Sequence, residues 1–186
     1  MRIKLLFLAL SFPLFFSCNH YRKDEREIKR LNGRNINIEW KNTILFKDSI
    51  MIREISDFPP IKIVTYVDKK MCASCMISCL NNWWSSLEEL NRDSSCLICI
   101  MDSISFIGIQ AGIGREKYDQ LYINTDCSFI RNNELESVKQ RNRTFLLDKN
   151  NNIVLVGEPF FHLSLQKLYI KTIIQLIDND GEFPMK

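Results

Sequence analysis

Apolar and polar residues follow two different periods along the chain, and the changes of period predict a mixed α/β domain. A largely apolar run at 61–67 predicts a central strand buried on both faces, because its β-branched residues stand close together. A spacing of three to four residues between 76 and 90 predicts an amphipathic helix. A second buried strand is predicted at 96–101. The centre of the domain is therefore expected to be a strand, a helix and a strand.

Segments on either side of this unit are expected to complete a mixed sheet covered by helices. Short apolar alternations at 33–57 predict a β-hairpin or a strand pair at the start of the domain. Two apolar runs within 144–157 flank an Asn-rich turn, which predicts a second hairpin. Spaced apolar residues at 165–177 predict a closing helix. The pattern at 102–120 is ambiguous, and a short strand is predicted at 118–124.

The N-terminus has the pattern of a secretory signal peptide. A basic start precedes an apolar run from Leu5 to Phe16, which is too short to span a bilayer stably. Ser17 and Cys18 follow at once, and a small residue directly before a cysteine resembles the lipobox of bacterial lipoproteins. This resemblance implies that residues 1–17 are removed, that Cys18 is lipidated, and that the protein is anchored outside the cytoplasm in the bacterial cell envelope. Ordinary cleavage near Ser17, with Cys18 left as a free thiol, stays open.

The predicted mature chain consists of a lipidated tether at 18–34 and one domain at 35–186. The tether contains a run of mixed charge that suits a solvated linker. The whole chain has 25 Lys and Arg residues against 22 Asp and Glu residues. Removal of the signal peptide takes away Arg2 and Lys4, so the mature chain is close to neutral. Its charge therefore gives no case for binding nucleic acid.

Candidate chemistry lies in Cys72-Ala73-Ser74-Cys75, where the predicted central strand gives way to the predicted helix. Two intervening residues place both sulfurs within one helical turn, close enough to bridge. The helix N-terminus stabilises a thiolate, which lowers the pKa of the first cysteine from its free value of ~8.5. Without Cys18, an even number of cysteines remains, so structural disulfides compete with a redox role. These cysteines are at positions 72, 75, 79, 96, 99 and 127.

The order of elements, the Cys-x-x-Cys pair and the run Thr-Phe-Leu-Leu-Asp-Lys-Asn-Asn-Asn-Ile-Val at 144–154 resemble the thioredoxin-like fold. More closely, they resemble the extracytoplasmic thioredoxin-like lipoproteins of the TlpA and ResA kind. The resemblance implies a mixed central sheet flanked by α-helices, with the N-terminal β-hairpin as an addition. It also implies a thiol–disulfide oxidoreductase in which Cys72 attacks and a buried Cys75 resolves the mixed disulfide. No metal and no cofactor beyond the redox disulfide is implied. Partners would be envelope protein thiols or disulfides, or an electron donor.

The resemblance places Met71, Ala73, Ser74, Arg143 and Thr144 around the dithiol, facing the substrate. Met71 stands where the family has Trp, and Ala73-Ser74 replaces the usual Gly-Pro or Glu-Pro. Arg143 replaces the cis-proline before the hairpin threonine, and a non-proline cis bond costs ~3 kcal/mol. Its charge is expected near the sulfurs, where it would favour a thiolate. The alternative function is a non-catalytic thioredoxin-fold module that binds an envelope partner and uses its cysteines structurally.

Cys72, Cys75, Cys96 and Cys99 also have a spacing that suits a zinc site made of four thiolates. Against this, the apolar run around Cys96 and Cys99 predicts a strand, where side chains three residues apart point to opposite faces. Export to an oxidising compartment favours disulfides or inert buried thiols. Cys79, Cys96 and Cys99 are therefore interpreted as core residues. Cys127 has no assigned role.

Overall fold

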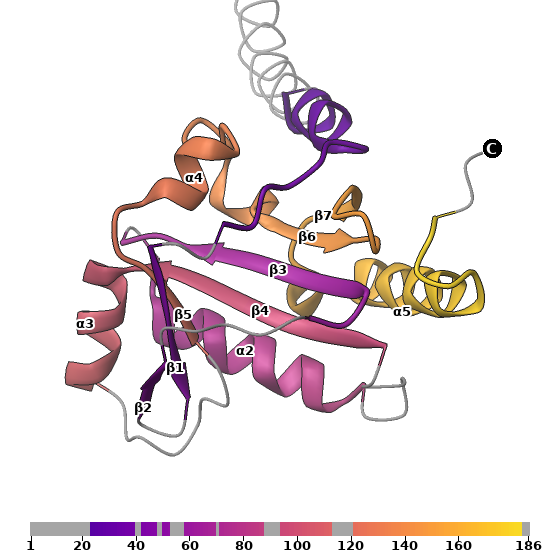
Figure 1. The fold of residues 1–186 in the computed structure, drawn as a ribbon. Helices are drawn as coiled ribbons and strands as arrows, with labels where there is room; N and C mark the ends of the chain where they lie inside the picture. Colours follow the sequence, from indigo (N-terminus) through magenta and orange to yellow (C-terminus); the bar gives the residue numbers. More distant parts are fainter. Residues whose placement is uncertain are drawn as a thin grey trace, which may run out of the picture.

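The centre of the molecule is a seven-stranded mixed sheet with the order β2-β1-β5-β4-β3-β6-β7 (Figure 1). The computed structural model describes residues 23–39, 42–47, 50–52, 58–69, 71–87, 94–112 and 121–183. The strands are β1 (Thr43–Lys47), β2 (Ile50–Ile52), β3 (Ile61–Val67), β4 (Ser95–Asp102), β5 (Leu121–Asn124), β6 (Thr144–Leu147) and β7 (Ile153–Val156). Strand β4 runs parallel to β3 and β5, and the other pairings are antiparallel. The prediction of a mixed α/β sheet is confirmed.

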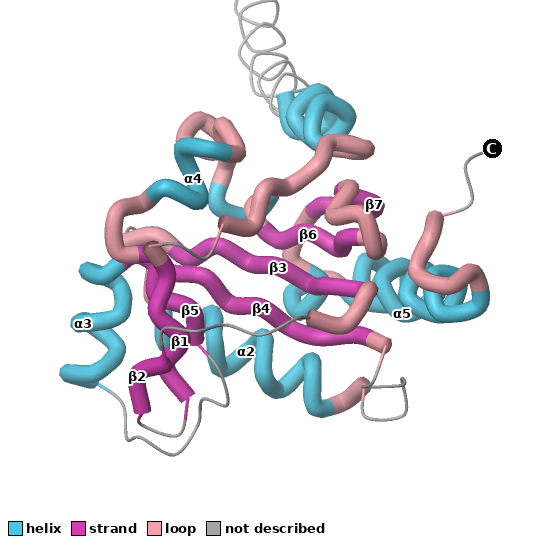
Figure 2. Tube along the Cα trace, viewed as in Figure 1, coloured by secondary structure: helices cyan, strands magenta, loops and turns pink. Residues whose placement is uncertain are grey.

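Helices cover both faces of this sheet. They are α2 (Ala73–Ser85), α3 (Ser103–Gly112), α4 (Ser128–Asn132), α5 (Leu163–Asp178), the 3₁₀ helices η2 (Gln140–Asn142) and η3 (Pro159–Phe161), and an N-terminal helix at 23–31. Side chains of α2, α3 and α5 share one core cluster, in which Trp83 packs edge-on against Tyr169. The N-terminal helix and α4 contribute Leu31, Phe129 and Ile130 to the opposite cluster. Figure 2 shows the strands side by side between these helices.

Strand β3 is the centre of both cores. All seven of its side chains are buried, as its apolar run predicts. Ile63 and Val67 belong to the cluster under α2, whereas Val64 and Tyr66 belong to the cluster on the other face. Burial of apolar surface on both sides stabilises the fold by ~25 cal/mol for each Å² removed from water. This strand therefore gives the dithiol at its carboxyl end a rigid base.

The N-terminal hairpin is joined to the sheet as an added edge. Strands β1 and β2 pair with one another, and β1 also pairs antiparallel with β5. The expected addition of a hairpin is therefore confirmed. The hairpin at β6 and β7 and the closing helix α5 also lie where their patterns predict them.

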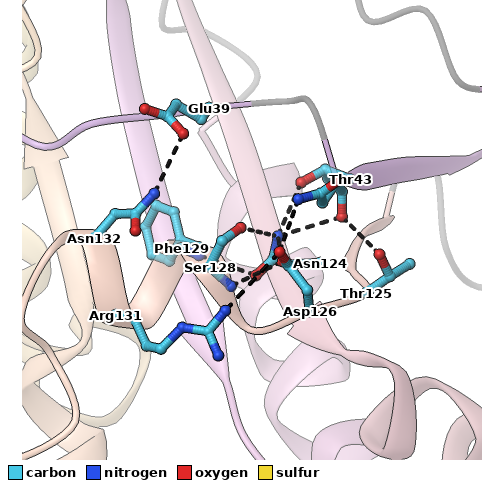
Figure 3. A network of polar contacts seen from close by, with 10 residues as sticks. Glu39, Thr43, Asn124, Thr125, Asp126, Ser128, Phe129, Arg131 and Asn132 are labelled. Carbon is cyan, nitrogen blue, oxygen red and sulfur yellow. Dashed lines mark hydrogen bonds and ion pairs between the residues drawn. The ribbon is translucent and has the colours of Figure 1, made fainter.

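A network of polar side chains connects the added hairpin to the turn after β5 (Figure 3). The side-chain amide of Asn124 donates to Thr43 Oγ1 at 3.3 Å and to Ser128 Oγ at 3.1 Å. Asn124 Oδ1 accepts from the Phe129 N–H at 3.0 Å, and Asp126 Oδ1 accepts from the Ser128 N–H at 2.9 Å. Two free amides at the start of α4 are therefore satisfied by side chains. The polar residues after β5 thus fix the turn and the beginning of α4.

The N-terminal helix contacts the domain, although its mixed charges are typical of a solvated tether. Asp24 forms ion pairs with Lys139 and Arg141, and the hydrogen bonds from Arg141 and Lys139 lower the pKa of Asp24 to about 2. Glu27 Oε1 accepts hydrogen bonds from the Lys139 backbone N–H at 3.1 Å and from the Asn142 side-chain amide at 2.6 Å. The mixed charges of this segment therefore have specific partners around η2.

Contacts with the sheet therefore begin before residue 35. Leu31 is fully buried, and the Gly33 N–H donates to the Ile153 carbonyl at 2.8 Å. The predicted signal peptide at 1–17 and the predicted lipidation site Cys18 lie outside the described residues. Among the helices of the described ranges, none combines the length and apolar character needed to cross a membrane.

Candidate redox site

Both cysteines of the Cys72-x-x-Cys75 pair lie at the start of α2, shortly after the carboxyl end of β3. Cys72 is the N-cap residue of α2, and Cys75 follows within the first turn. Backbone N–H groups without helical partners and the positive end of the helix dipole are located there. Both residues are exposed to solvent. The dithiol is therefore accessible and stands where a helix favours a thiolate.

The two thiol groups are in direct contact. Cys72 Sγ lies 2.7 Å from Cys75 Sγ, and the Ser74 hydroxyl oxygen lies 3.3 Å from Cys72 Sγ. An intramolecular disulfide between these cysteines therefore requires little displacement of the chain. Cys75 is exposed, so the expectation of a buried resolving thiol is wrong.

These contacts make the two thiols unequal acids. The side-chain hydrogen bond between Cys72 and Cys75 lowers the pKa of Cys72 to about 7, with further contributions from the Ser74 hydroxyl and the Cys75 backbone N–H. The same contact with Cys72, together with the negative charge of its thiolate, raises the pKa of Cys75. Cys72 is therefore the thiol that ionises first and the better candidate for nucleophilic attack.

A pocket of about 370 Å³ opens beside Cys72. Its lining residues are Lys69, Met71, Cys72, Ala73, Ser74, Ile104 and Ser105, which come from the loop after β3 and from the first turns of α2 and α3. Three residues that were predicted to face the substrate, Met71, Ala73 and Ser74, therefore surround an open space next to the candidate nucleophile.

Comparisons with known proteins find similar structures but no family. No family model matches the chain, and no curated protein matches it significantly. An uncharacterised thioredoxin-like protein from Porphyromonas gingivalis has 14% identity and a TM-score of 0.44, with 79% of this chain and 97% of that chain covered. A protein from Chlorobium tepidum described as the thiol:disulfide interchange protein DsbE has 13% identity and a TM-score of 0.42, with 61% of this chain and 79% of that chain covered. AhpC of Mycobacterium tuberculosis has 15% identity and a TM-score of 0.38, with 67% of this chain and 74% of that chain covered.

The topology of the chain decides its fold. Strand β3, helix α2 and the parallel strand β4 are followed by the antiparallel β6–β7 hairpin and the closing helix α5, with a dithiol at the start of α2. The fold is thioredoxin-like.

The Arg143 side chain points away from the place where it was expected. The expectation that its charge faces the sulfurs of the dithiol is wrong. The residue is 6% exposed, and its Nη1 forms an ion pair with Asp68 Oδ2 at 2.7 Å. Arg143 Nε donates to the Val138 carbonyl at 2.9 Å, and Nη2 donates to the Glu136 carbonyl at 3.1 Å. Hydrogen bonds and an acidic partner therefore hold this guanidinium inside the protein, and it is not a lining residue of the pocket.

Thr144 is also withdrawn from solvent. It is fully buried, and its Oγ1 lies 2.8 Å from Thr65 Oγ1 on the neighbouring strand β3. No cis peptide bond occurs in the described ranges, and Arg143 has φ −99° and ψ 19° at the end of η2. The β6 side of β3 is therefore closed by Arg143 and Thr144, while the α3 side carries the pocket.

The cysteines of β4 are separated from the dithiol and from one another. Cys99 belongs to the core cluster under α2, whereas Cys96 packs against the cluster on the other face of the sheet. Burial raises the pKa of each thiol to about 12. Among the described residues, no three His, Cys, Asp or Glu side chains gather closely enough to hold a metal ion. The four cysteines of the zinc hypothesis therefore do not form one site.

The other two described cysteines are Cys79 and Cys127, which are not part of the Cys72–Cys75 pair. Cys79 is half-buried one turn beyond Cys75 on α2. Cys127 is half-buried and has the left-handed φ of 56° at the residue before α4. Both are free thiols in this structure.

Helix α3 contributes the part of the site that the sequence pattern did not predict. Asp102 Oδ1 accepts from the Ser105 N–H at 2.7 Å, and its Oδ2 accepts from the Lys69 N–H at 3.2 Å. One carboxylate therefore caps α3 and also holds the loop that leads to the dithiol. An Asp-Ser pair directly after a predicted strand is an N-cap signal. That signal at Asp102 could have indicated a helix in the ambiguous region.

Proposed function

We propose that this protein carries out thiol–disulfide exchange through Cys72 and Cys75. The observation that carries the proposal is the exposed Cys72 Sγ, 2.7 Å from Cys75 Sγ at the start of α2, with a pKa lowered to about 7. A pKa near 7 leaves a substantial share of such thiols ionised at neutral pH, and the thiolate is the reactive form. The pocket beside Cys72 leaves room for a partner to approach.

The exchange begins when the Cys72 thiolate attacks one sulfur of a partner disulfide. The partner's S–S bond breaks, a bond forms between Cys72 Sγ and the attacked sulfur, and the other partner sulfur leaves with the electron pair. Cys75 then loses its proton and attacks Cys72 Sγ, which releases the second partner sulfur. The partner ends with two reduced sulfurs, and the protein ends with a Cys72–Cys75 disulfide. The reverse sequence oxidises a partner dithiol with the same atoms.

The proposed setting is the outer side of a bacterial membrane, with a lipid on Cys18 after removal of residues 1–17. The basic and apolar pattern at 1–17, followed by Ser17-Cys18, supports this. The proposed partners are thiols or disulfides of envelope proteins, or an electron donor. Labelled fatty acid is expected in the protein from expressing cells and not in a Cys18→Ala variant. Equal labelling of both would overturn the anchor.

Trapping of a partner tests the proposed chemistry. A Cys75→Ala variant is expected to accumulate mixed disulfides through Cys72 in envelope extracts, because the resolving thiol is missing. The matched control is Cys79→Ala, which removes a different cysteine of α2 and leaves both thiols of the dithiol in place. Two results together would overturn the proposal: the Cys75→Ala variant forms no mixed disulfides, and the native protein does not reduce insulin.

A second candidate function is a thioredoxin-fold module that binds an envelope partner without catalysis. The burial of Arg143 and Thr144 favours it, because the two residues expected to face substrate on the β6 side are closed off. A Cys72→Ala/Cys75→Ala variant that still copurifies with the same partner would support the binding module. Loss of the partner in that variant would favour exchange.

A further inference from the structure

We propose that the pocket beside Cys72 selects partner polypeptides in which an apolar residue and an acidic residue flank the reacting cysteine. This inference rests on the proposed exchange and names the partner chemistry of the same site. The occupant is an extended segment of a partner protein. It binds on the α3 side of Cys72, because Arg143 and Thr144 are buried on the β6 side.

The outer wall of the pocket is apolar and unusually exposed. Ile104 of α3 lines the pocket and is 62% exposed, and Ile107 one turn later is 64% exposed. Residues three apart on a helix lie on the same side, so the two isoleucines form a continuous strip that leads away from the pocket. Met71 and Ala73 provide apolar surface on the side of α2. A bulky apolar side chain next to the partner's cysteine would cover this surface.

Lys69 gives the pocket a positive charge. Within the described ranges its ammonium group has no ion pair, although the residue lines the pocket. Asp68, which precedes Lys69 in the chain, and Asp102, which accepts the Lys69 backbone N–H, are both already engaged. Asp68 pairs with Arg143, and the Asp102 carboxylate accepts the backbone N–H groups of Lys69 and Ser105. A carboxylate of the partner is therefore the complementary group for Lys69.

Ser105 provides an independent indication of a ligand. It lines the pocket, is 6% exposed, and its hydroxyl has no hydrogen-bond partner in the described part of the chain. Buried hydroxyl groups are usually satisfied, because an unmade hydrogen bond is unfavourable. A carbonyl or carboxylate oxygen of an extended segment would supply the missing acceptor. The pocket therefore presents an apolar surface, a cation and a hydroxyl donor next to the nucleophile.

Paired peptides test this selection in the full-length protein. Two synthetic peptides carry the same activated disulfide on their cysteine, one flanked by leucine and glutamate and the other by serine and lysine. The rate of attack by Cys72 is measured for each, and the result is the ratio of the two rates within one protein. We expect the peptide with leucine and glutamate to react about tenfold faster, because it gains one apolar contact and one contact between opposite charges.

Variants of the pocket assign the preference to its walls. Ile104→Ser and Lys69→Gln are each expected to reduce the ratio to about threefold or less, because each removes one of the two contacts. Ile174→Ser and Lys167→Gln on α5 are the matched controls, since they change exposed residues of the same types far along the chain from the dithiol. Circular dichroism of every variant checks the fold.

The outcomes separate the inference from the proposed function. A native protein that attacks neither peptide faster than a Cys72→Ala variant does would overturn the exchange chemistry itself. A native protein that attacks both peptides at equal rates would leave the exchange standing and overturn the selection. A ratio that falls as far in Ile174→Ser as in Ile104→Ser would also overturn the assignment to this pocket.

Discussion

Two Cys-x-x-Cys pairs with the same spacing have opposite chemistry in this chain. Cys72 and Cys75 begin a helix, which places side chains three residues apart on the same side, and their sulfurs lie 2.7 Å apart. Cys96 and Cys99 lie in β4, where the same spacing directs them to opposite faces and into different core clusters. Spacing alone therefore does not define a dithiol, because the element that carries the cysteines decides whether they meet.

Solvent and hydrogen bonds separate the acid strengths of the two pairs. Hydrogen bonds at the exposed helix start lower the pKa of Cys72 to about 7, whereas burial raises the pKa of Cys96 and of Cys99 to about 12. A thiolate is the nucleophile in disulfide exchange. One pair is therefore suited to reaction, and the other is suited to filling the core.

The largest expected effect is the loss of exchange in Cys72→Ser. A serine hydroxyl does not ionise at neutral pH and forms no disulfide, so the rate of insulin reduction should fall by a factor of ~10³ or more. Cys96→Ala should keep the rate within about twofold, because that thiol belongs to the other face of the sheet. Comparable losses in both variants would break the distinction between the pairs.

Alkylation with iodoacetamide across a range of pH is the next sharpest measurement. Modification of Cys72 should slow as pH falls through about 7, because protonation removes its thiolate. Burial raises the pKa of Cys96 and of Cys99 to about 12, so both should stay unmodified at pH 7 while the protein is folded. Mass analysis of peptides after brief labelling reads each site separately. Early modification of Cys99 in the folded protein would contradict its buried position.

Elements with a strong hydrophobic period could be predicted from the sequence. Strand β3 and helix α5 follow their patterns, because each buries a regular set of apolar side chains. The sequence at 102–120 has no such period, since Ile104 and Ile107 of α3 are exposed to solvent. The α3 wall of the pocket therefore escaped prediction, apart from the cap signal at Asp102.

Partners far apart in the sequence explain the other differences. The position of Arg143 beside the hairpin could be predicted. The direction of its side chain depends on Asp68, which lies 75 residues earlier in the sequence. The charges of the N-terminal helix suggest solvent exposure, yet Asp24 meets Lys139, which lies 115 residues later. Local pattern indicates which side chains are charged and does not indicate which distant group neutralises them.

Substitution of the buried thiols tests the structural half of the comparison. Cys99→Ser should lower the free energy of unfolding by ~1–3 kcal/mol, because a hydroxyl replaces a thiol in an apolar cluster. Cys75→Ser, measured under reducing conditions, should leave the free energy of unfolding almost unchanged, since Cys75 is exposed. Urea denaturation of the two variants gives both values. Equal stability losses would mean that burial does not distinguish the pairs.

The smallest expected effect concerns the contact that makes Cys72 acidic. Ser74→Ala should raise the pKa of Cys72 only slightly, because the Cys75 thiol, the largest contributor to the lowered pKa, is retained. The ultraviolet absorbance of the thiolate, followed across pH, measures this shift. Ser85→Ala, at the exposed end of the same helix, is the control and should leave the titration unchanged. A pKa that does not move in Ser74→Ala would assign the acidity of Cys72 to Cys75 and the helix start alone, whereas a return to about 9 would assign it to the serine hydroxyl.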